Sequence, residues 1–277
     1  MAIDVNKPTM RREVQVAGQA NVEDRSHRFG VVREIKKRII VVASALQKHG
    51  KDHWGFTAPG PIAVHAFDEG YDEPANKFIK GFEGYPKKVI KICEYEVPEG
   101  GKKFDAALQS QAESIWEDFV ANYRWSLRNF RSVVVDTATE MWELLRLARF
   151  GALSTGQTTS YGPVNAEMRK LIREGYEHDA NIIFLQKLKK KYIGRDWSGE
   201  YEPAGWGDMS YESQVVIRLW REDPAVFHTT IEDCRQEPRL NGVDMTEVSV
   251  DGVGILEYND FPAVAARIFN EDREAWV

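Results

Sequence analysis

Short, strongly apolar segments that alternate with helix-like segments constrain the fold of this chain more than any other feature. Four of them are rich in β-branched residues and too short to be independent helices, as expected for buried strands of a parallel sheet. They are RIIVVA (38–43), PIAVHAF (61–67), SVVVD (132–136) and NIIFLQ (181–186). This repetition of strand and helix predicts an α/β fold, with a mostly parallel sheet and helices on both faces.

The segments between these strands have the spacing of helices. Residues 106–129 repeat apolar side chains every three or four positions after Asp105, a residue type that caps helix N-termini. A second helix is predicted at 138–150, ended by Gly151, and a third from about Asn165 to His178. The other expected elements are strands at 87–97 and 213–222, a weak strand at 248–258 and a short helix at 261–270.

The length of the chain suits one core with extensions at both ends. Its 277 residues are 43% hydrophobic, enough for a core of about 200 residues. Residues 1–30 are polar and charged without a sustained apolar period, as in an arm that orders only on a partner. We therefore expect an N-terminal arm at 1–30, a core at 31–237 and a C-terminal extension at 238–277.

Composition narrows the function classes only slightly. The net charge of −6 gives no overall basic field, so any contact with nucleic acid needs a local basic patch. Cys93 and Cys234 lie far apart with no Cys/His cluster nearby, which favours a reducing compartment and argues against zinc. The chain shows neither a signal-peptide core nor an apolar run near the roughly 18 residues of a membrane span. The expected location is therefore cytoplasmic, with no membrane contact.

The segment ALQKHGKD (45–52) follows the first strand and partly matches the phosphate-binding pattern GxxxxGK[ST]. Gly50 and Lys51 match, whereas Ala45 replaces the first glycine and Asp52 replaces the Ser or Thr. Such a loop surrounds phosphates with backbone N–H groups, and its lysine binds the β- and γ-phosphate oxygens. Ala45 fits poorly if that position needs a positive φ, and Asp52 either repels phosphate or binds Mg²⁺ directly.

The same segment supplies the candidate nucleotide-binding residues, and the pattern has an alternative explanation. We expect phosphate contacts from this loop and the start of its helix: Ala45, Lys48, His49, Gly50, Lys51, Asp52 and His53. A plain turn from strand to helix explains the pattern equally well. His49 and His53 are four residues apart, a spacing that suits either a metal pair or the surface of a loop and helix.

Carboxylates at two other strand ends are candidates for metal binding and catalysis. Asp136 ends the strand SVVVD, where a carboxylate can hold Mg²⁺ with its water shell; the alternative is a cap for the following helix. Asp68 and Glu69 follow the strand PIAVHAF. They either orient or deprotonate an attacking water, or are solvated turn residues.

The strand NIIFLQ ends in Gln186 and leads into the lysine-rich run KLKKKY (187–192). A strand-end amide beside phosphates can sense the γ-phosphate. The lysines either reach the nucleotide of a neighbouring subunit, bind DNA phosphate, or form a solvated face.

Aromatic residues fall into two groups. Trp116, Trp125 and Trp142 lie on helical stripes and are expected in the core. A glycine-rich stretch further along holds aromatic residues that either stack on nucleic-acid bases or fold back onto their own sheet: Trp197, Tyr201 and Trp206.

The order of these segments resembles that of the phage RecA-core ATPases that support single-strand annealing and recombination. The most specific pieces are DTATEMWELLR (136–146) and GKDHWGFTAPGPIAV (50–64), and the likeness spans roughly residues 38–237. It implies a RecA-type P-loop NTPase core that binds ATP and Mg²⁺ and acts on single-stranded DNA. It also implies a homo-oligomer in the bacterial host cytoplasm, with a phage single-strand-binding protein as a further partner.

By this resemblance Lys51 takes the Walker A role and Asp136 the Walker B role, while Gln186 and either Asp68 or Glu69 serve catalysis. Three functions stay open: an ATP-hydrolysing recombination protein, a degenerate member that binds or assembles without hydrolysis, and a small-molecule kinase. The unaltered glycine–lysine pair favours the first, and the two departures in the loop favour the second. The third lacks any visible substrate lid.

Overall fold

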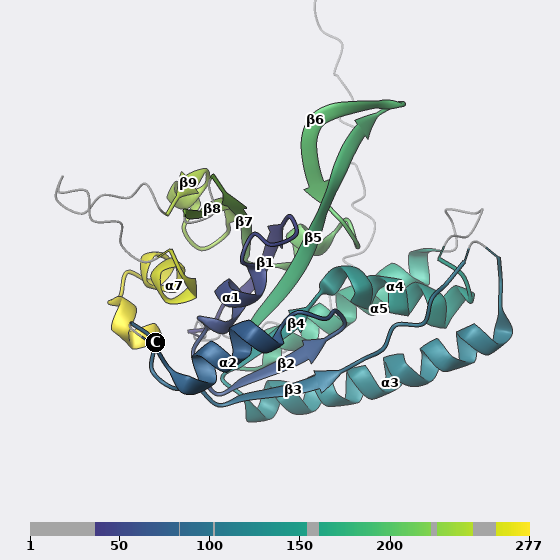
Figure 1. Ribbon diagram of the computed structural model, residues 1–277, viewed down its shortest axis with the longest axis horizontal. Coiled ribbons are helices and arrows are strands. Elements are labelled where there is room, and N and C mark those ends of the chain that lie inside the picture. The colour runs from purple at the N-terminus through teal and green to yellow at the C-terminus, as the bar shows by residue number, and fades with distance from the viewer. Residues whose placement is uncertain (1–36, 83, 102, 154–160, 223–225, 246–258) are drawn as a thin grey trace, which may run out of the picture. The chain divides into compact units, whose positions relative to one another are not determined.

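The computed structural model describes residues 37–82, 84–101, 103–153, 161–222, 226–245 and 259–277. The sheet has the order β3-β2-β4-β5-β1-β7-β8-β9, with β6 paired to β5 (Figure 1). The strands are β1 (Ile40–Ala45), β2 (Ile62–Ala66), β3 (Ile90–Glu94), β4 (Ser132–Asp136), β5 (Asn181–Ile193), β6 (Asp196–Pro203), β7 (Val215–Arg221), β8 (Phe227–Cys234) and β9 (Val243–Asp244). The helices are α1 (Lys51–Phe56), α2 (Asp72–Lys80), α3 (Ala106–Asn129), α4 (Ala138–Phe150), α5 (Tyr161–Glu174), α6 (Met209–Glu212) and α7 (Phe261–Phe269).

Most of this sheet is parallel. The six strands from β3 to β7 run parallel to one another, whereas β8, β9 and β6 pair antiparallel with their neighbours. The four strands predicted from apolar runs are β1, β2, β4 and the first half of β5, and they lie in the middle of the sheet. The predicted α/β architecture, with a mostly parallel sheet and helices on both faces, is confirmed.

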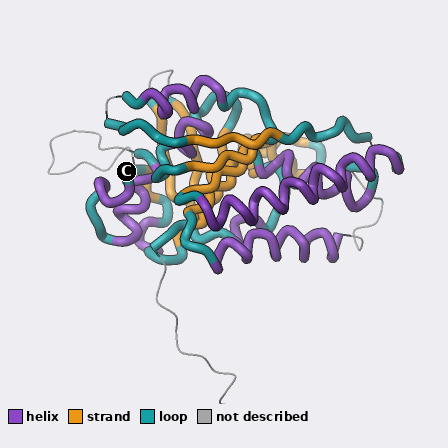
Figure 2. The backbone as a smooth tube through the Cα atoms, turned by 90° about the horizontal axis from the view of Figure 1, so that it is seen from below, coloured by secondary structure: helices purple, strands orange, loops and turns teal. Residues whose placement is uncertain are grey.

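Two apolar cores lie on the two faces of the sheet, because successive side chains of a strand point to opposite sides. In β1, Val41 and Ala43 belong to one core, whereas Ile40 and Val42 belong to the other. The first core, called here the α1 side, is covered by α1, α2 and α7. The second, the α3 side, is covered by α3, α4 and α5. Figure 2 shows helices on both sides of the strands.

The longest helix, α3, begins as the sequence predicts. The Asp105 side chain accepts hydrogen bonds from the backbone N–H groups of Ala107 and Leu108, which satisfies donors at the helix start. Trp116 is buried on the α3 side, but Trp125 is 57% exposed, so its predicted place in the core is wrong. Trp125 lies outside the buried stripe, which continues at the following residues of the helix.

Helix α5 and strand β5 differ most from their predicted bounds. Helix α5 spans Tyr161–Glu174, so it already includes residues before the predicted start near Asn165. Strand β5 continues through the lysine-rich run to Ile193 and pairs there with β6. Figure 1 shows these two strands extending beyond the rest of the sheet.

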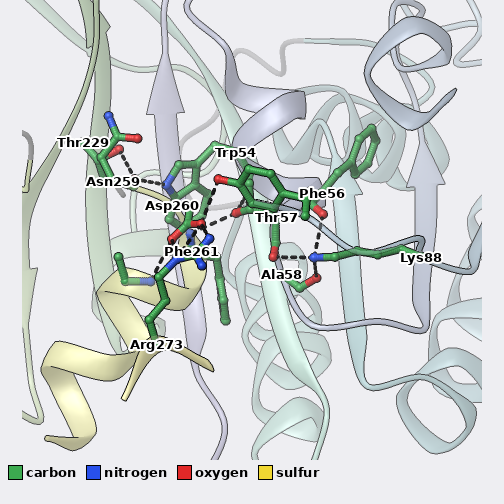
Figure 3. A network of polar contacts seen from close by, with 12 residues as sticks. Trp54, Phe56, Thr57, Ala58, Lys88, Thr229, Asn259, Asp260, Phe261 and Arg273 are labelled. Atoms are coloured by element: carbon green, nitrogen blue, oxygen red, sulfur yellow. Dashed lines mark hydrogen bonds and ion pairs between the residues drawn. The ribbon is translucent and has the colours of Figure 1, made fainter. Parts of the chain in front are cut away.

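Helix α1 has only six residues, and contacts from distant parts of the chain hold its end (Figure 3). Lys88 is buried and donates from Nζ to the carbonyl oxygens of Thr57 and Ala58, at 2.6 and 2.7 Å. On the other side, the N–H of Phe261 donates to Thr57 Oγ1 at 2.9 Å, and Trp54 Nε1 donates to a carbonyl of the same C-terminal segment. The C-terminal residues therefore fix the helix that follows the candidate phosphate loop.

Some predicted features lie outside the described residues, namely the arm at 1–30, the weak strand at 248–258 and part of the loop at 151–163. In the described part of the chain, no helix combines the length and the apolar character that crossing a membrane requires.

Candidate functional site

The candidate phosphate loop connects the buried strand β1 to α1. Ala45 is the last residue of β1 and pairs with Lys187 of β5, so the loop proper consists of residues 46–50. Positive φ angles occur at Lys48 (62°) and Gly50 (80°), not at Ala45. The missing first glycine therefore introduces no backbone strain at Ala45.

Lys51, the first residue of α1, points to the end of β4. Its Nζ lies 2.7 Å from Oδ1 of Asp136 and also donates to Asp52. Strand β5 lies between β1 and β4, and its register aligns Leu185 with Asp136 and Lys187 with Ala45. The last residues of β1 and β4 therefore lie at the same edge of the sheet. Asp136 is 1% exposed and the Lys51 side chain 14%, so the pair is shielded from water.

Burial and nearby charges shift the titration of both partners. Burial raises the pKa of the Asp136 carboxyl to about 7; the carboxylates of Asp52 and Asp68 add to this rise, while the Lys51 ammonium opposes it. Burial alone would lower the pKa of Lys51, but Asp136 and Asp52 outweigh it and raise that pKa above its ordinary value. Lys51 is therefore a permanent cation beside a carboxyl that titrates near neutral pH.

The two predicted catalytic carboxylates have different surroundings: Asp68 lies close enough to Asp136 to raise the pKa of that carboxyl, whereas no contact of Glu69 with the Lys51–Asp136 pair is seen among the described residues. Asp68 forms a salt bridge of 3.0 Å with Lys187, which also pairs with Glu140 at the start of α4. Glu69 is exposed and forms no ion pair among the residues that the structure describes. Both Asp68 and Glu69 line a hollow of about 1020 Å³. Glu69 is the carboxylate that remains free to contact a water molecule.

Gln186 is not brought to the Lys51–Asp136 pair. Its neighbours in β5 alternate between the two cores, with Leu185 on the α1 side and Phe184 on the α3 side. Gln186 lies two residues after Phe184, so its side chain is on the α3 side as well. Its buried amide nitrogen has no hydrogen-bond partner among the described residues, and a Cβ built on Gly205 would lie 3.6 Å from it. The predicted γ-phosphate role of Gln186 would need a change of its side-chain position.

The two histidines of the segment do not form a metal pair. The ring of His53 packs among aromatic side chains, with its centroid 5.0 Å from that of Phe78 and 5.9 Å from that of Phe82. His49 stays in the loop, where burial and then Arg221 lower its pKa. Within the described ranges, no group of three or more His, Cys, Asp or Glu side chains is arranged to hold a metal by itself.

The hairpin of β5 and β6 has two chemically different sides. On one, Lys189 pairs with Glu202 at 3.3 Å and Lys191 with Glu200 at 2.7 Å. These exposed pairs neutralise much of the lysine run. The lysines are therefore not a free stripe for phosphate.

The other side of the hairpin, called here the aromatic side, carries Lys190, Tyr192, Trp197 and Tyr201. Lys190 Nζ lies 5.0 Å from the centroid of the Trp197 ring, and this ring lies 6.0 Å from that of Tyr201. Tyr192 is aligned with Trp197 across the hairpin. These three rings are 37–57% exposed, whereas Trp206, predicted with them, is buried at 4%. The structure thus separates one of the three predicted aromatic residues from the exposed group.

Sequence reasoning overlooked Lys187 and Glu140 as individual members of the site. A signal existed, because Lys187 follows Ile183 and Leu185 at the spacing of one strand face. Two further residues beside the loop, Arg221 and Phe227, gave no signal. They reach the loop only through the pairing of β7 with β1 and β8.

No protein-family model matches this chain, and no curated protein matches it. Many solved structures are similar to it, and three of them, all at low identity, are described next. One is the ATPase domain of another protein, with 13% identity and a TM-score of 0.39, covering 74% of this chain and 80% of that one. A KaiC-like protein from Pyrococcus horikoshii OT3 has 14% identity and a TM-score of 0.40, covering 76% and 84%. The RadB recombinase has 12% identity and a TM-score of 0.42, covering 76% and 86%. Likenesses this low carry no conclusion about activity.

Proposed function

We propose that this chain is a RecA-type P-loop protein that binds Mg²⁺-ATP and acts on single-stranded DNA in phage recombination or annealing. The single observation behind the nucleotide site is the contact between Lys51 Nζ and Asp136 Oδ1 at 2.7 Å. A lysine after a strand-to-helix loop, beside a buried strand-end carboxylate, is the pair of groups that phosphate–magnesium binding requires. The recombination role and the phage origin rest on the sequence resemblance alone.

The residues around Lys51 suit a Mg²⁺ ion bound together with phosphates. Asp52 and Asp136 both contact one ammonium group, so their oxygens surround one point, and carboxylate oxygen is the ligand that Mg²⁺ prefers. Two carboxylates leave the remaining ligand positions to phosphate oxygens and water, as is usual for this ion. When bound, the ion would neutralise phosphate charge that Asp52 otherwise repels.

In this proposal the chain's own residues have separate tasks. Lys51 binds phosphate oxygens, and Asp136 holds Lys51 in place and, together with Asp52, would bind the metal. Lys187 keeps Asp68 fixed through their 3.0 Å salt bridge, while Glu69 orients water for hydrolysis. Gln186 enters only if its amide turns towards the nucleotide.

The aromatic side of the hairpin is the proposed contact for single-stranded DNA. Exposed rings stack on bases regardless of sequence, and Lys190 supplies a charge beside them. The paired lysines contribute little, so this contact is expected to depend only weakly on salt. A ring or filament of copies of this chain is the assembly in which such hairpins would line one strand.

A fluorescent ATP analogue titrated with Mg²⁺ tests the nucleotide site. Lys51→Ala is expected to weaken binding about 10- to 100-fold, since it removes a charge-assisted contact. Lys77→Ala, which changes an exposed lysine on α2, is the matched control and is expected to bind as wild type does. Equal binding by wild type and Lys51→Ala, or no binding by either, would contradict the proposal.

A second candidate function is a binding or assembly module that does not hydrolyse ATP. The observation that favours it is the hydrogen bond from Lys51 to Asp52, which occupies the amine that a phosphate would need. Phosphate release in the presence of Mg²⁺-ATP separates the two candidates. Turnover that Glu69→Gln abolishes supports the ATPase, whereas nucleotide binding without turnover supports the module.

A further inference from the structure

An aromatic ring lies directly against the candidate phosphate loop. A Cβ built on Gly50 would lie 3.1 Å from Cδ1 and 3.2 Å from Cε1 of Phe227, so the ring touches the backbone next to Lys51. Gly50 also has a φ of 80°. Both the close approach and the backbone angle require glycine at this position.

The strand register explains why Phe227 reaches the loop. Leu219 of β7 is aligned with Ala45, the last residue of β1. Arg221 is two residues further along β7, so it lies beyond the end of β1, beside the loop. Phe227, the first residue of β8, is aligned with Arg221 across the β7–β8 pair. Sheet pairing therefore fixes both residues at the same edge as Lys51.

The ring and the guanidinium are available to a ligand. Phe227 remains 41% exposed although one part of the ring covers Gly50. Arg221 Cζ lies 5.8 Å from the ring centroid, and Arg221 forms no salt bridge with any described residue. The exposed part of the ring and the guanidinium beside it are thus open to a ligand bound at the loop.

We propose that Phe227 and Arg221 form the base-binding end of the nucleotide site, so that the ligand is a nucleoside polyphosphate and not a bare polyphosphate. The aromatic base stacks on Phe227 while its phosphates reach Lys51, and Arg221 lies against the same ring. This inference rests on the proposed function, because it assigns the second half of the same ligand. A purine is favoured over a pyrimidine, since its larger ring system covers more of the Phe227 ring.

Two ligands and three variants separate this role from simple packing against Gly50. The ligands are Mg²⁺-ATP and Mg²⁺-tripolyphosphate, which has the phosphates without the base, and binding is measured by calorimetry. Phe227→Leu keeps an apolar side chain against the loop but removes the aromatic face. Phe227→Tyr keeps that face, and Tyr211→Leu, which alters a ring 74% exposed on α6, is the matched control.

The expected result is that wild type binds ATP more tightly than tripolyphosphate. Phe227→Leu should weaken ATP binding about tenfold while leaving tripolyphosphate binding unchanged, because only the base contact is lost. Phe227→Tyr and Tyr211→Leu should bind both ligands as wild type does.

Other outcomes overturn the inference in distinguishable ways. If Phe227→Leu weakens both ligands equally, the ring only supports the loop; if it weakens neither, or if wild type does not prefer ATP, no base binds there. In these cases the phosphate site of the proposed function still stands. If wild type binds neither ligand, the proposed function fails, and this inference fails with it.

Discussion

Two regions of the molecule pair lysines with carboxylates: the Lys51 site, at the edge of the sheet where the parallel strands end, and the β5–β6 hairpin. At the site, Lys51 is largely buried and Asp136 is 1% exposed. On the hairpin, Lys191 and Glu200 have side chains 43% and 66% exposed. The same pairing of residue types is therefore shielded in one region and screened by water in the other. Burial, not the number of charges, separates a candidate site from a solvated surface.

The largest expected difference between the two regions concerns stability and its dependence on pH. The pKa of Asp136 is raised to about 7 from 3.8, so the folded protein binds this proton more tightly than the unfolded chain. Stability therefore falls as pH rises through the interval between these two values. Asp136→Asn cannot ionise, so this fall in stability with rising pH should be absent from the variant.

Glu202→Gln is the matched change on the hairpin. Because its pair with Lys189 is exposed, it should alter the free energy of unfolding by less than about 0.5 kcal/mol at any pH. Urea unfolding from pH 4 to pH 8 measures both variants. Parallel pH profiles for wild type and Asp136→Asn would show that the buried carboxyl does not titrate as described.

The second expected difference lies within the hairpin. Trp197→Ala should weaken binding of single-stranded DNA about tenfold, since it removes a stacking surface. Lys191→Ala should change it less than about threefold, because that lysine is already paired with Glu200. Fluorescence anisotropy with a labelled oligonucleotide at several salt concentrations measures both. A larger effect of the lysine, with a steep salt slope, would reverse this assignment.

These elements also show how far the sequence could predict the molecule. The strands β1, β2 and β4 were readable because continuous apolar runs are typical of strands covered on both faces. The second half of β5 was not, since a projecting strand has no core to impose an apolar pattern and KLKKKY reads as a solvated run. Strand β8 was missed for a related reason, as FHTTIEDC mixes polar and apolar residues at the border of the sheet.

The site was predictable in part. The proximity of Lys51 and Asp136 was predictable because Lys51 comes soon after one recognisable strand and Asp136 ends another, and parallel strands end at one edge. Gln186 was expected beside them on the same reasoning, but strand alternation turns its side chain to the other face, which its position at a strand end does not reveal. Phe227 could not be found, because its contact with Gly50 joins segments far apart in the chain.

The third prediction concerns the charge that departs from the phosphate-loop pattern. Asp52→Thr removes a carboxylate that both repels phosphate and occupies Lys51, so ATP without Mg²⁺ should bind about fivefold more tightly. In the presence of Mg²⁺ this gain should be lost, because the same carboxylate is a proposed metal ligand. No comparable gain is expected from Glu200→Thr on the hairpin. The fluorescent-nucleotide titration with and without Mg²⁺ measures both, and an equal gain in the presence of Mg²⁺ would contradict the assignment of Asp52 as a metal ligand.

The smallest expected difference is in the stability lost when either of two glycines with similar backbone angles is replaced by alanine. Gly50 has a φ of 80° and touches Phe227, whereas Gly199 on the hairpin has a φ of 86° with open space around it. Alanine at either position costs about 1–2 kcal/mol for the left-handed backbone. Gly50→Ala should cost about 1 kcal/mol more, because the ring must also move. Equal losses in thermal unfolding would mean that Phe227 does not pack against the loop.

The arrangement of Lys51, Asp136 and Asp52 is the central claim, and a crystal grown with Mn²⁺ and ADP tests it most directly. Anomalous scattering locates Mn²⁺, which takes the oxygen ligands that Mg²⁺ takes. The account predicts a single strong peak beside the carboxylates of Asp136 and Asp52, with a phosphate group against Lys51. A peak elsewhere on the protein, or a nucleotide bound away from Lys51, would contradict it.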